Sequence, residues 1–252
     1  MVVLKNILTV ALAVFLPDSY KEGSAAAVFN NKPDKDWKVY KTGLKNLSGI
    51  CFNKDKTLLL AVTDKGNIYE LDFQGKIKRQ LPFDEFGDFE AITINPQNGK
   101  VYLADENTMS DYQLNSDEKK IDKVVSVTVP NATYNRGIEG VSYGKDTLYI
   151  ANQADPCRIF KYHLKDKKMS YFDVPFSTFL SDIFYDATDN TLWLVDSKKY
   201  QITHCNLNGQ IIAQQNIPMV RKAEAIAIDR EKNIAWIGCD KTGNLYQIKL
   251  KI

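Results

Sequence analysis

The chain has 252 residues, of which 44% are hydrophobic and 25% are charged, a composition typical of a folded globular protein and not of a disordered one. Its formal net charge is only +2, and it contains no dense run of lysine and arginine, so we expect no nucleic-acid partner. Length alone leaves the number of domains open, because all-β folds often exceed about 200 residues as a single domain.

The first 32 residues differ in composition from the rest of the chain. Lys5 precedes an apolar run over residues 7–16, which has the length of the hydrophobic region of a secretory signal peptide. The run is too short to cross a bilayer as a helix, so we expect no transmembrane span. Ala25 and Ala27 offer a small-residue cleavage site. We expect residues 1–32 to be a signal-peptide-like leader or an N-terminal arm, and the protein to be exported to the periplasm or elsewhere in the cell envelope.

Beyond this segment, one short stretch recurs five times along the chain. Its second residues lie 42, 49, 42 and 43 positions apart. The five copies are LSGICFN (47–53), FEAITIN (89–95), IEGVSYG (138–144), LSDIFYD (180–186) and AEAIAID (223–229). Each is followed by a second and a third strand-like stretch, and four of the five units also contain a fourth. This recurrence predicts five copies of one structural unit.

Turn signals separate these stretches, and Asn208-Gly209, between a third and a fourth stretch, is a strong signal for a tight β-hairpin. Four antiparallel strands in a unit of roughly 40–50 residues, repeated around an axis, are typical of a β-propeller. We therefore predict an all-β fold for residues 33–252: a five-bladed β-propeller of four-stranded antiparallel blades.

The fifth unit lacks a fourth stretch, whereas WKVYKTG (37–43) looks like a fourth strand without the other three. Placing this N-terminal strand on the outside of the last blade closes the ring and pairs an edge that would otherwise be exposed.

In a propeller the first strand of each blade lines the central channel, and the second strand runs antiparallel beside it. The starts of the first strands and the ends of the second strands therefore meet at one mouth of the channel. The first strands contribute Ser48, Glu90, Glu139, Ser181 and Glu224 to this mouth. The second strands end at Thr63, Asp105, Asn152, Asp196 and Cys239, followed by Asp64, Glu106, Gln153, Ser197 and Asp240.

Three glutamates facing one another across a narrow channel repel strongly unless they are protonated, paired with cations or bound to a metal. Ca²⁺ accepts six to eight oxygen ligands in flexible geometry, whereas zinc and copper prefer imidazole or thiolate. We therefore predict a Ca²⁺ site at the mouth. Its expected ligands are Glu90, Glu139, Glu224, Asp105, Asn152 and Asp196. The alternative is that the glutamates are solvated at the mouth of a water-filled channel and accept hydrogen bonds from backbone amides.

The order Ser-Glu-Glu-Ser-Glu through the five stretches, with the phrases IYELDFQGKIKRQLPF and VYLADEN, resembles the bacterial SdiA-regulated family over about residues 37–252. The resemblance implies an exported five-bladed propeller, distantly related to NHL-repeat proteins, with a calcium site and no established reaction. It carries over Glu90, Glu139 and Glu224 as matching acids, and Asp105 as the acid that ends the second strand of the second blade. Blades three and four depart from the family at the mouth, where they read ANQADPC and VDSKKY.

Three functions are consistent with this pattern. The prediction is a calcium-bearing module that binds a small molecule or a protein at the channel mouth. A calcium-dependent hydrolase of lactones or esters, in which the ion polarises the carbonyl, is the alternative. His163 and His204 lie in third stretches, away from the channel, so this alternative would need a carboxylate as its base. The third is an interaction scaffold with a purely structural ion.

Overall fold

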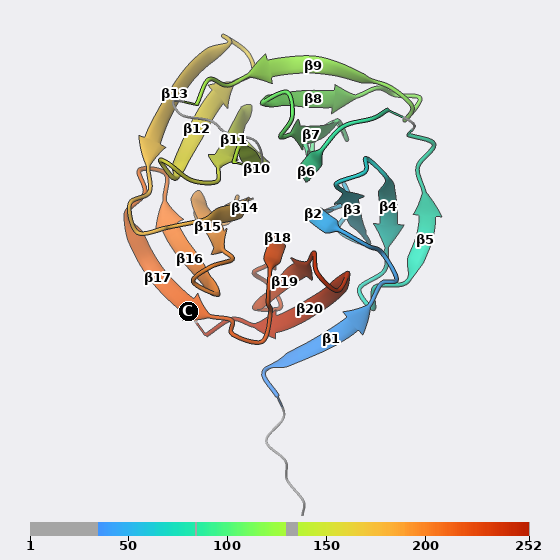
Figure 1. Cartoon of the computed structure of the whole chain (residues 1–252), viewed down its shortest axis with the longest axis vertical. Coiled ribbons are helices and arrows are strands. Elements are labelled where there is room, and N and C mark those ends of the chain that lie inside the picture. Colours follow the sequence, from blue (N-terminus) through green and yellow to red (C-terminus); the bar gives the residue numbers. More distant parts are fainter. Residues whose placement is uncertain (1–34, 84, 130–135, 252) are drawn as a thin grey trace, which may run out of the picture. The chain divides into compact units, whose positions relative to one another are not determined.

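Five antiparallel sheets surround a central axis in the computed structural model, which describes residues 35–83, 85–129 and 136–251 (Figure 1). The regular structure of these residues consists of β-strands alone, and they include no helix with the length and apolarity that a membrane span requires. The predicted leader, residues 1–32, lies outside the described residues. The prediction of a five-bladed propeller is confirmed.

Each blade follows the order of the predicted stretches. Blade 1 consists of β2 (Leu47–Phe52), β3 (Leu59–Thr63), β4 (Ile68–Leu71) and β5 (Ile77–Gln80). Blade 2 consists of β6 (Phe89–Ile94), β7 (Val101–Asp105), β8 (Ser110–Leu114) and β9 (Ile121–Ser126). Blade 3 consists of β10 (Ile138–Gly144), β11 (Thr147–Asn152), β12 (Arg158–His163) and β13 (Lys168–Asp173). Blade 4 consists of β14 (Leu180–Asp186), β15 (Thr191–Asp196), β16 (Gln201–Asn206) and β17 (Ile211–Asn216).

Blade 5 combines the two ends of the described chain. It consists of β18 (Ala223–Asp229), β19 (Ile234–Cys239), β20 (Asn244–Lys249) and, outermost, β1 (Trp37–Lys41). The pairing of β1 with β20 is antiparallel and runs from Trp37 opposite Ile248 to Lys41 opposite Asn244. The predicted closure of the ring by the N-terminal strand is therefore confirmed, and β20 is not an open edge.

The Asn208-Gly209 turn joins β16 to β17, as its sequence predicts. Gly209 has a φ of +78°, a backbone conformation that glycine adopts without steric cost, and its N–H donates to the carbonyl of Asn206 at 3.0 Å. The side-chain oxygen of Asn206 accepts the N–H groups of Asn208 and Gln210. The turn thus satisfies its own polar groups.

The first strands of neighbouring blades approach closely at the axis. A Cβ atom on Gly49 of β2 would lie 2.8 Å from the Cα of Ala91 in blade 2, and one on Gly140 of β10 would lie 2.9 Å from the Cα of Asp182 in blade 4. Buried side chains connect the same strands: the Asp182 carboxylate accepts the N–H of Ile226 at 2.7 Å. These contacts set the positions of the first strands, and with them the positions of any groups at the channel mouth.

We expect Gly49→Ala and Gly140→Ala each to lower the free energy of unfolding by about 1–3 kcal/mol, because the added methyl group meets backbone atoms that cannot rotate away. Ala91→Gly, at the equivalent position of β6, is the matched control: it removes a methyl group and introduces no overlap. Chemical denaturation of the three variants measures the effect. Wild-type stability in both Gly→Ala variants would contradict the close packing of the first strands.

Candidate metal centre

A register shift recurs at the second residue of every first strand. In each blade the pairing of first and second strands skips one residue, so that this residue has no partner across the ladder. The skipped residues are Ser48, Glu90, Glu139, Ser181 and Glu224. Such a bulge turns a side chain away from the direction that strand alternation would give it. The same local distortion therefore presents all three predicted glutamates at one mouth of the channel.

A second contact also recurs in every blade. The residue that follows the second strand donates its N–H to the carbonyl of the residue two positions before the skipped one. The donor and acceptor residues are Asp64 and Asn46 in blade 1, Glu106 and Asp88 in blade 2, Gln153 and Gly137 in blade 3, Ser197 and Phe179 in blade 4, and Asp240 and Lys222 in blade 5. The contact holds the residue after the second strand beside the link that leads into the first strand of the same blade.

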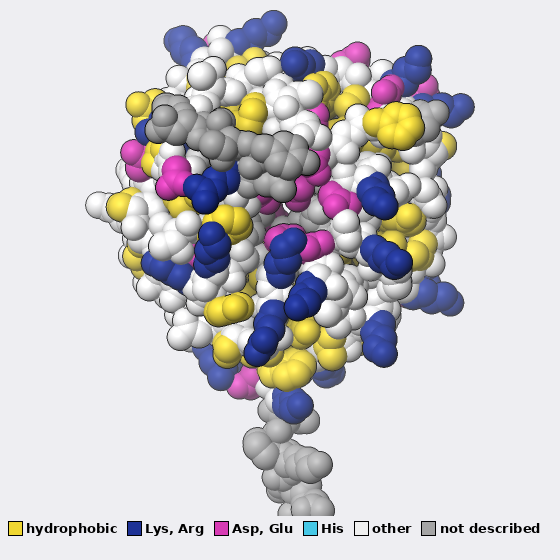
Figure 2. Space-filling model, in the orientation of Figure 1, with side chains coloured by type: hydrophobic (Ala, Val, Ile, Leu, Met, Phe, Trp, Pro, Cys, Tyr) yellow, Lys and Arg dark blue, Asp and Glu magenta, His cyan; other side chains and the backbone are white. Residues whose placement is uncertain are grey.

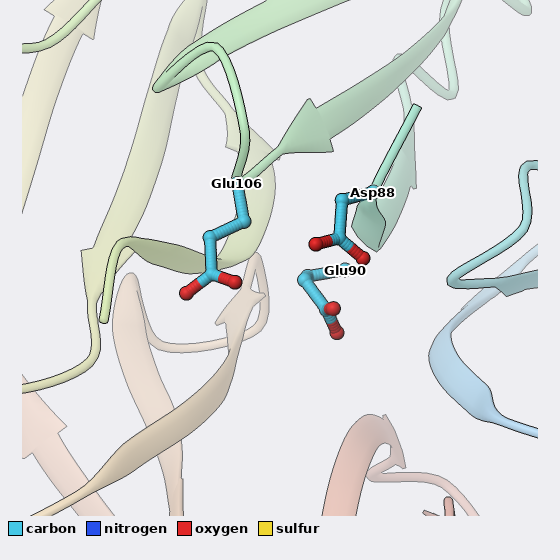
Figure 3. A group of neighbouring side chains, drawn as sticks. All are labelled: Asp88, Glu90 and Glu106. Atoms are coloured by element: carbon cyan, nitrogen blue, oxygen red, sulfur yellow. The ribbon is translucent and has the colours of Figure 1, made fainter. Parts of the chain in front are cut away.

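In blade 2 these contacts bring three carboxylates together. Oxygen atoms of Asp88, Glu90 and Glu106 all lie within 4.8 Å of one another. Figure 3 shows the three side chains extending toward a common space, Asp88 and Glu90 from around the start of β6 and Glu106 from the loop after β7. Among the described residues, no lysine or arginine forms an ion pair with any of the three.

Burial and mutual repulsion raise the pKa values of these acids. Burial is the main cause that raises the pKa of Glu90 to about 9, and the charges of Glu224, Asp88 and Glu106 add to it. The pKa values of Asp88 and Glu106 are raised for the same reason, with burial as the first cause. A nearby cation would reverse the repulsive contribution and favour the ionised forms.

Blade 3 provides hydrogen-bond donors to two acids of the mouth, Glu139 and Glu106. The amide nitrogen of Gln153 donates to Glu139 Oε1, and the N–H of Gly137 donates to Glu106 Oε1 at 2.8 Å. Glu139 is only 5% exposed, and burial followed by the charges of Glu90, Glu106 and Glu224 raises its pKa well above the ordinary value. Blade 3 thus adds one acid, Glu139, to the cluster, and it also provides two uncharged hydrogen-bond donors, the Gln153 amide and the Gly137 N–H.

Glu224 differs from the other two predicted glutamates because a cation contacts it. The Lys222 ammonium lies 3.3 Å from Glu224 Oε1 and also contacts the carboxylate of Asp240. Burial, followed by the charge of Asp240, raises the pKa of Glu224 to about 7, and Lys222 opposes this rise. Arg136, by contrast, pairs with Asp155 and not with a mouth glutamate.

Asp105, Asn152 and Asp196 end the second strands, as predicted, but their side chains bind the adjoining loops. Asp105 accepts the N–H groups of Asp88 and Asn107, and Asp196 accepts the N–H groups of Thr178 and Lys199. The Asn152 amide donates to two loop carbonyls, those of Ala154 and Pro156. Neither Asp105 nor Asp196 belongs to the group of close carboxylates. Of the predicted ligands, the structure therefore places Glu90 in this group. Its neighbours there are Asp88 and Glu106, the residue after Asp105.

Several buried polar atoms at the mouth lack hydrogen-bond partners among the described residues. They are Thr63 Oγ1, Asp64 Oδ1, Asn152 Oδ1, Gln153 Oε1 and Ser181 Oγ. Such groups in a native protein call for a water molecule, an ion or a ligand. All five are oxygen atoms: Asp64 offers a further carboxylate oxygen, and the others are amide or hydroxyl oxygens. In Figure 2, aspartate and glutamate side chains gather around a hollow near the centre of the face that it displays, and a lysine or arginine side chain lies beside them just below the hollow.

The fold and this mouth define the protein as a five-bladed β-propeller with an acidic opening of its central channel. A model of the SdiA-regulated family matches residues 31–175, more than half of the chain, and the chain belongs to this family. The resemblance drawn from the repeated stretches is therefore confirmed.

Solved structures of other proteins share the fold at low sequence identity. Glutaminyl cyclase of Myxococcus xanthus superposes with a TM-score of 0.65 at 8% identity, covering 84% of this chain and 94% of that one. A chain of the nidogen/laminin complex gives 0.61 at 13% identity, covering 82% and 76%, and a streptogramin B lyase gives 0.52 at 15%, covering 86% and 75%. At these identities the likeness shows the fold alone.

The raised pKa of Glu90 predicts how stability depends on pH in the presence of chelator. A carboxyl group whose pKa is higher in the folded state than in the unfolded state destabilises the fold once the unfolded chain ionises. Stability should therefore fall as the pH rises from 4.5, the ordinary value, to about 9. Glu90→Gln should flatten this slope and stabilise the protein at pH 8 by about 1 kcal/mol or more.

Denaturation between pH 4.5 and 9 measures this slope, with Glu231→Gln, on the exposed turn between β18 and β19, as the control. A wild-type stability that stays level or increases over this range would show that Glu90 is not held in its acid form.

Proposed function

We propose that this protein binds one Ca²⁺ ion at the mouth of its central channel. The observation that carries the proposal is the convergence of Asp88, Glu90 and Glu106 from one blade, with no lysine or arginine paired to them in the described parts of the chain. The nearest ligands would be these three carboxylates. Glu139 and Glu224 extend the cluster, since the charge of Glu224 acts on Glu90 and the charges of Glu90 and Glu106 act on Glu139.

The chemistry of the donors supports calcium over a softer metal. The described groups at the mouth are carboxylate, amide and hydroxyl oxygens, which suit a hard divalent cation. Cys239 is the one thiol that ends a second strand, and its Sγ donates to the carbonyl of Arg221 at 2.8 Å. Both histidines lie in third strands, His163 in β12 and His204 in β16, so imidazole ligands are not offered here.

The role we assign is that of an exported binding module of the cell envelope, in which the ion neutralises the acids of the mouth and the mouth receives a small molecule or a protein. Export is supported by the apolar run over residues 7–16. Related folds occur in a protein–protein complex as well as in enzymes, as the nidogen/laminin complex and the glutaminyl cyclase illustrate. Fold alone therefore leaves the choice between binder and enzyme to the site.

A calcium-dependent hydrolase of lactones or esters is the alternative function. One observation favours it: several carboxylates converge at the mouth, so one of them could serve as a general base beside an ion that the others bind. Turnover assays on the calcium-loaded protein with lactones and aryl esters separate the two functions, and we expect no turnover above background. Turnover by the calcium-loaded wild-type protein that disappears in chelator would establish the hydrolase instead.

Calcium should raise the melting temperature of the wild-type protein, because an ion that binds only the folded state stabilises it by mass action. At a concentration about 100 times the dissociation constant the expected gain is about 2.7 kcal/mol, which corresponds to roughly 5–11 °C for a protein of this size. Glu90→Gln and Glu106→Gln should each abolish most of this gain.

Differential scanning fluorimetry with calcium and with chelator provides the measurement. Glu231→Gln, which removes a carboxylate from the opposite end of blade 5, should retain the full calcium effect. Identical melting curves with calcium and with chelator in the wild-type protein would refute calcium binding.

A further inference from the structure

Lys222 and Asp88 occupy equivalent places in two blades and carry opposite charges. Each lies two residues before the skipped residue of its first strand, and each accepts the backbone hydrogen bond from the acid that follows the second strand. In blade 5 the ammonium group of Lys222 therefore faces Asp240 and Glu224. In blade 2 the carboxylate of Asp88 faces Glu106 and Glu90.

Blade 1 has a neutral donor at the same place. There Asn46 is the equivalent residue, and its side-chain amide donates to the carboxylate of Asp64. Blades 1 and 5 thus each provide a hydrogen-bond donor from the chain itself for the acid at the end of the second strand. Blade 2 has an acid where the other two have a donor, so a cation from solution would relieve the repulsion among its carboxylates.

We propose that Lys222 is a tethered cation, which does in blade 5 what the bound calcium ion does in blade 2 and competes with that ion for Glu224. This inference rests on the proposed calcium site. Glu224 is the shared group: it contacts the Lys222 ammonium at 3.3 Å, and its charge is the largest electrostatic influence on Glu90. Lys222 therefore confines the ion to the side of the mouth formed by blades 2 and 3.

Charge repulsion by Lys222 and its competition for Glu224 both lower the affinity of the mouth for calcium. A fixed ammonium group near a divalent ion lowers its affinity, and it also withholds one carboxylate from the coordination sphere. The Lys222 side chain is 55% exposed, so it can leave Glu224 and enter solvent without disturbing the core. Its removal should therefore strengthen calcium binding while it weakens the metal-free protein.

The test is a calcium titration by calorimetry at fixed pH and ionic strength on the full chain. Lys222→Gln should bind calcium about tenfold more tightly than the wild-type protein. Lys222→Asn should behave alike, and it suits the positive φ of +64° at this residue, which asparagine tolerates. Lys222→Arg retains the charge and should stay within about twofold of wild type. Lys241→Gln, an exposed lysine beside Asp240 that forms no ion pair among the described residues, is the matched control.

A second pair of variants transfers the arrangement of blade 5 to blade 2. Asp88→Lys should abolish calcium binding and make the protein more stable in chelator than Asp88→Asn, which removes the carboxylate without adding a cation. Melting temperatures in chelator measure the difference in stability between Asp88→Lys and Asp88→Asn. Both variants lack the Asp88 carboxylate, so loss of this ligand alone would not produce a difference between them.

Equal calcium affinity in wild type and Lys222→Gln, or weaker binding in the variant, would overturn the role of Lys222 while leaving the calcium site in place. Absence of calcium binding in the wild-type protein would overturn the calcium site itself and the competition that depends on it. Equal stability of Asp88→Lys and Asp88→Asn in chelator would contradict the equivalence of the two blades.

Discussion

The close approach of five first strands around the axis is the constraint on which the rest of the structure depends. Gly49 and Gly140 leave no room for a side chain between neighbouring strands, so the first strands pack backbone against backbone. The bulge at the second residue of each strand then directs three glutamates to the same opening. Acids that are far apart in the sequence become neighbours in a buried place, and burial raises their pKa values.

The five blades meet this constraint in different ways. Blade 5 balances its acids with Lys222, and blade 3 uses the Gln153 amide and a backbone N–H. Blade 4 has a serine at its skipped position and therefore adds no charge there. Blade 2 alone combines three carboxylates with no lysine or arginine paired to them in the described ranges. This asymmetry is a physical reason to place a cation near blade 2 and not on the axis.

The fold was predictable from sequence because the propeller repeats one pattern five times. Each first strand carries the same alternation. The stretch around residues 37–41 has no neighbouring strand-like stretches that would form a blade with it, so it was expected to complete the last blade, where it pairs with β20. Glu90, Glu139 and Glu224 were found for the same reason, as residues at one position of the repeat. That calcium binds them stays a prediction.

Other parts of the site could not be read from the repeat. Asp105 and Asp196 end their strands, where a carboxylate readily caps the following turn, and the structure uses them in this way. The mouth position is one residue later, which is why Glu106 belongs to the cluster. Asp88 lies in the link before β6, at a position where the five blades carry five different residue types, and so no recurring signal marked it. Lys222 lies at the same variable position as Asp88, so the repeat did not mark its pairing with Glu224 either.

The decisive test of calcium binding at blade 2 is a crystal structure of the protein grown with Ca²⁺, in which anomalous scattering identifies the ion. We expect a single anomalous peak coordinated by carboxylate oxygens of Asp88, Glu90 and Glu106. Solvent alone among these three side chains at saturating calcium, or an ion bound elsewhere on the propeller, would contradict it.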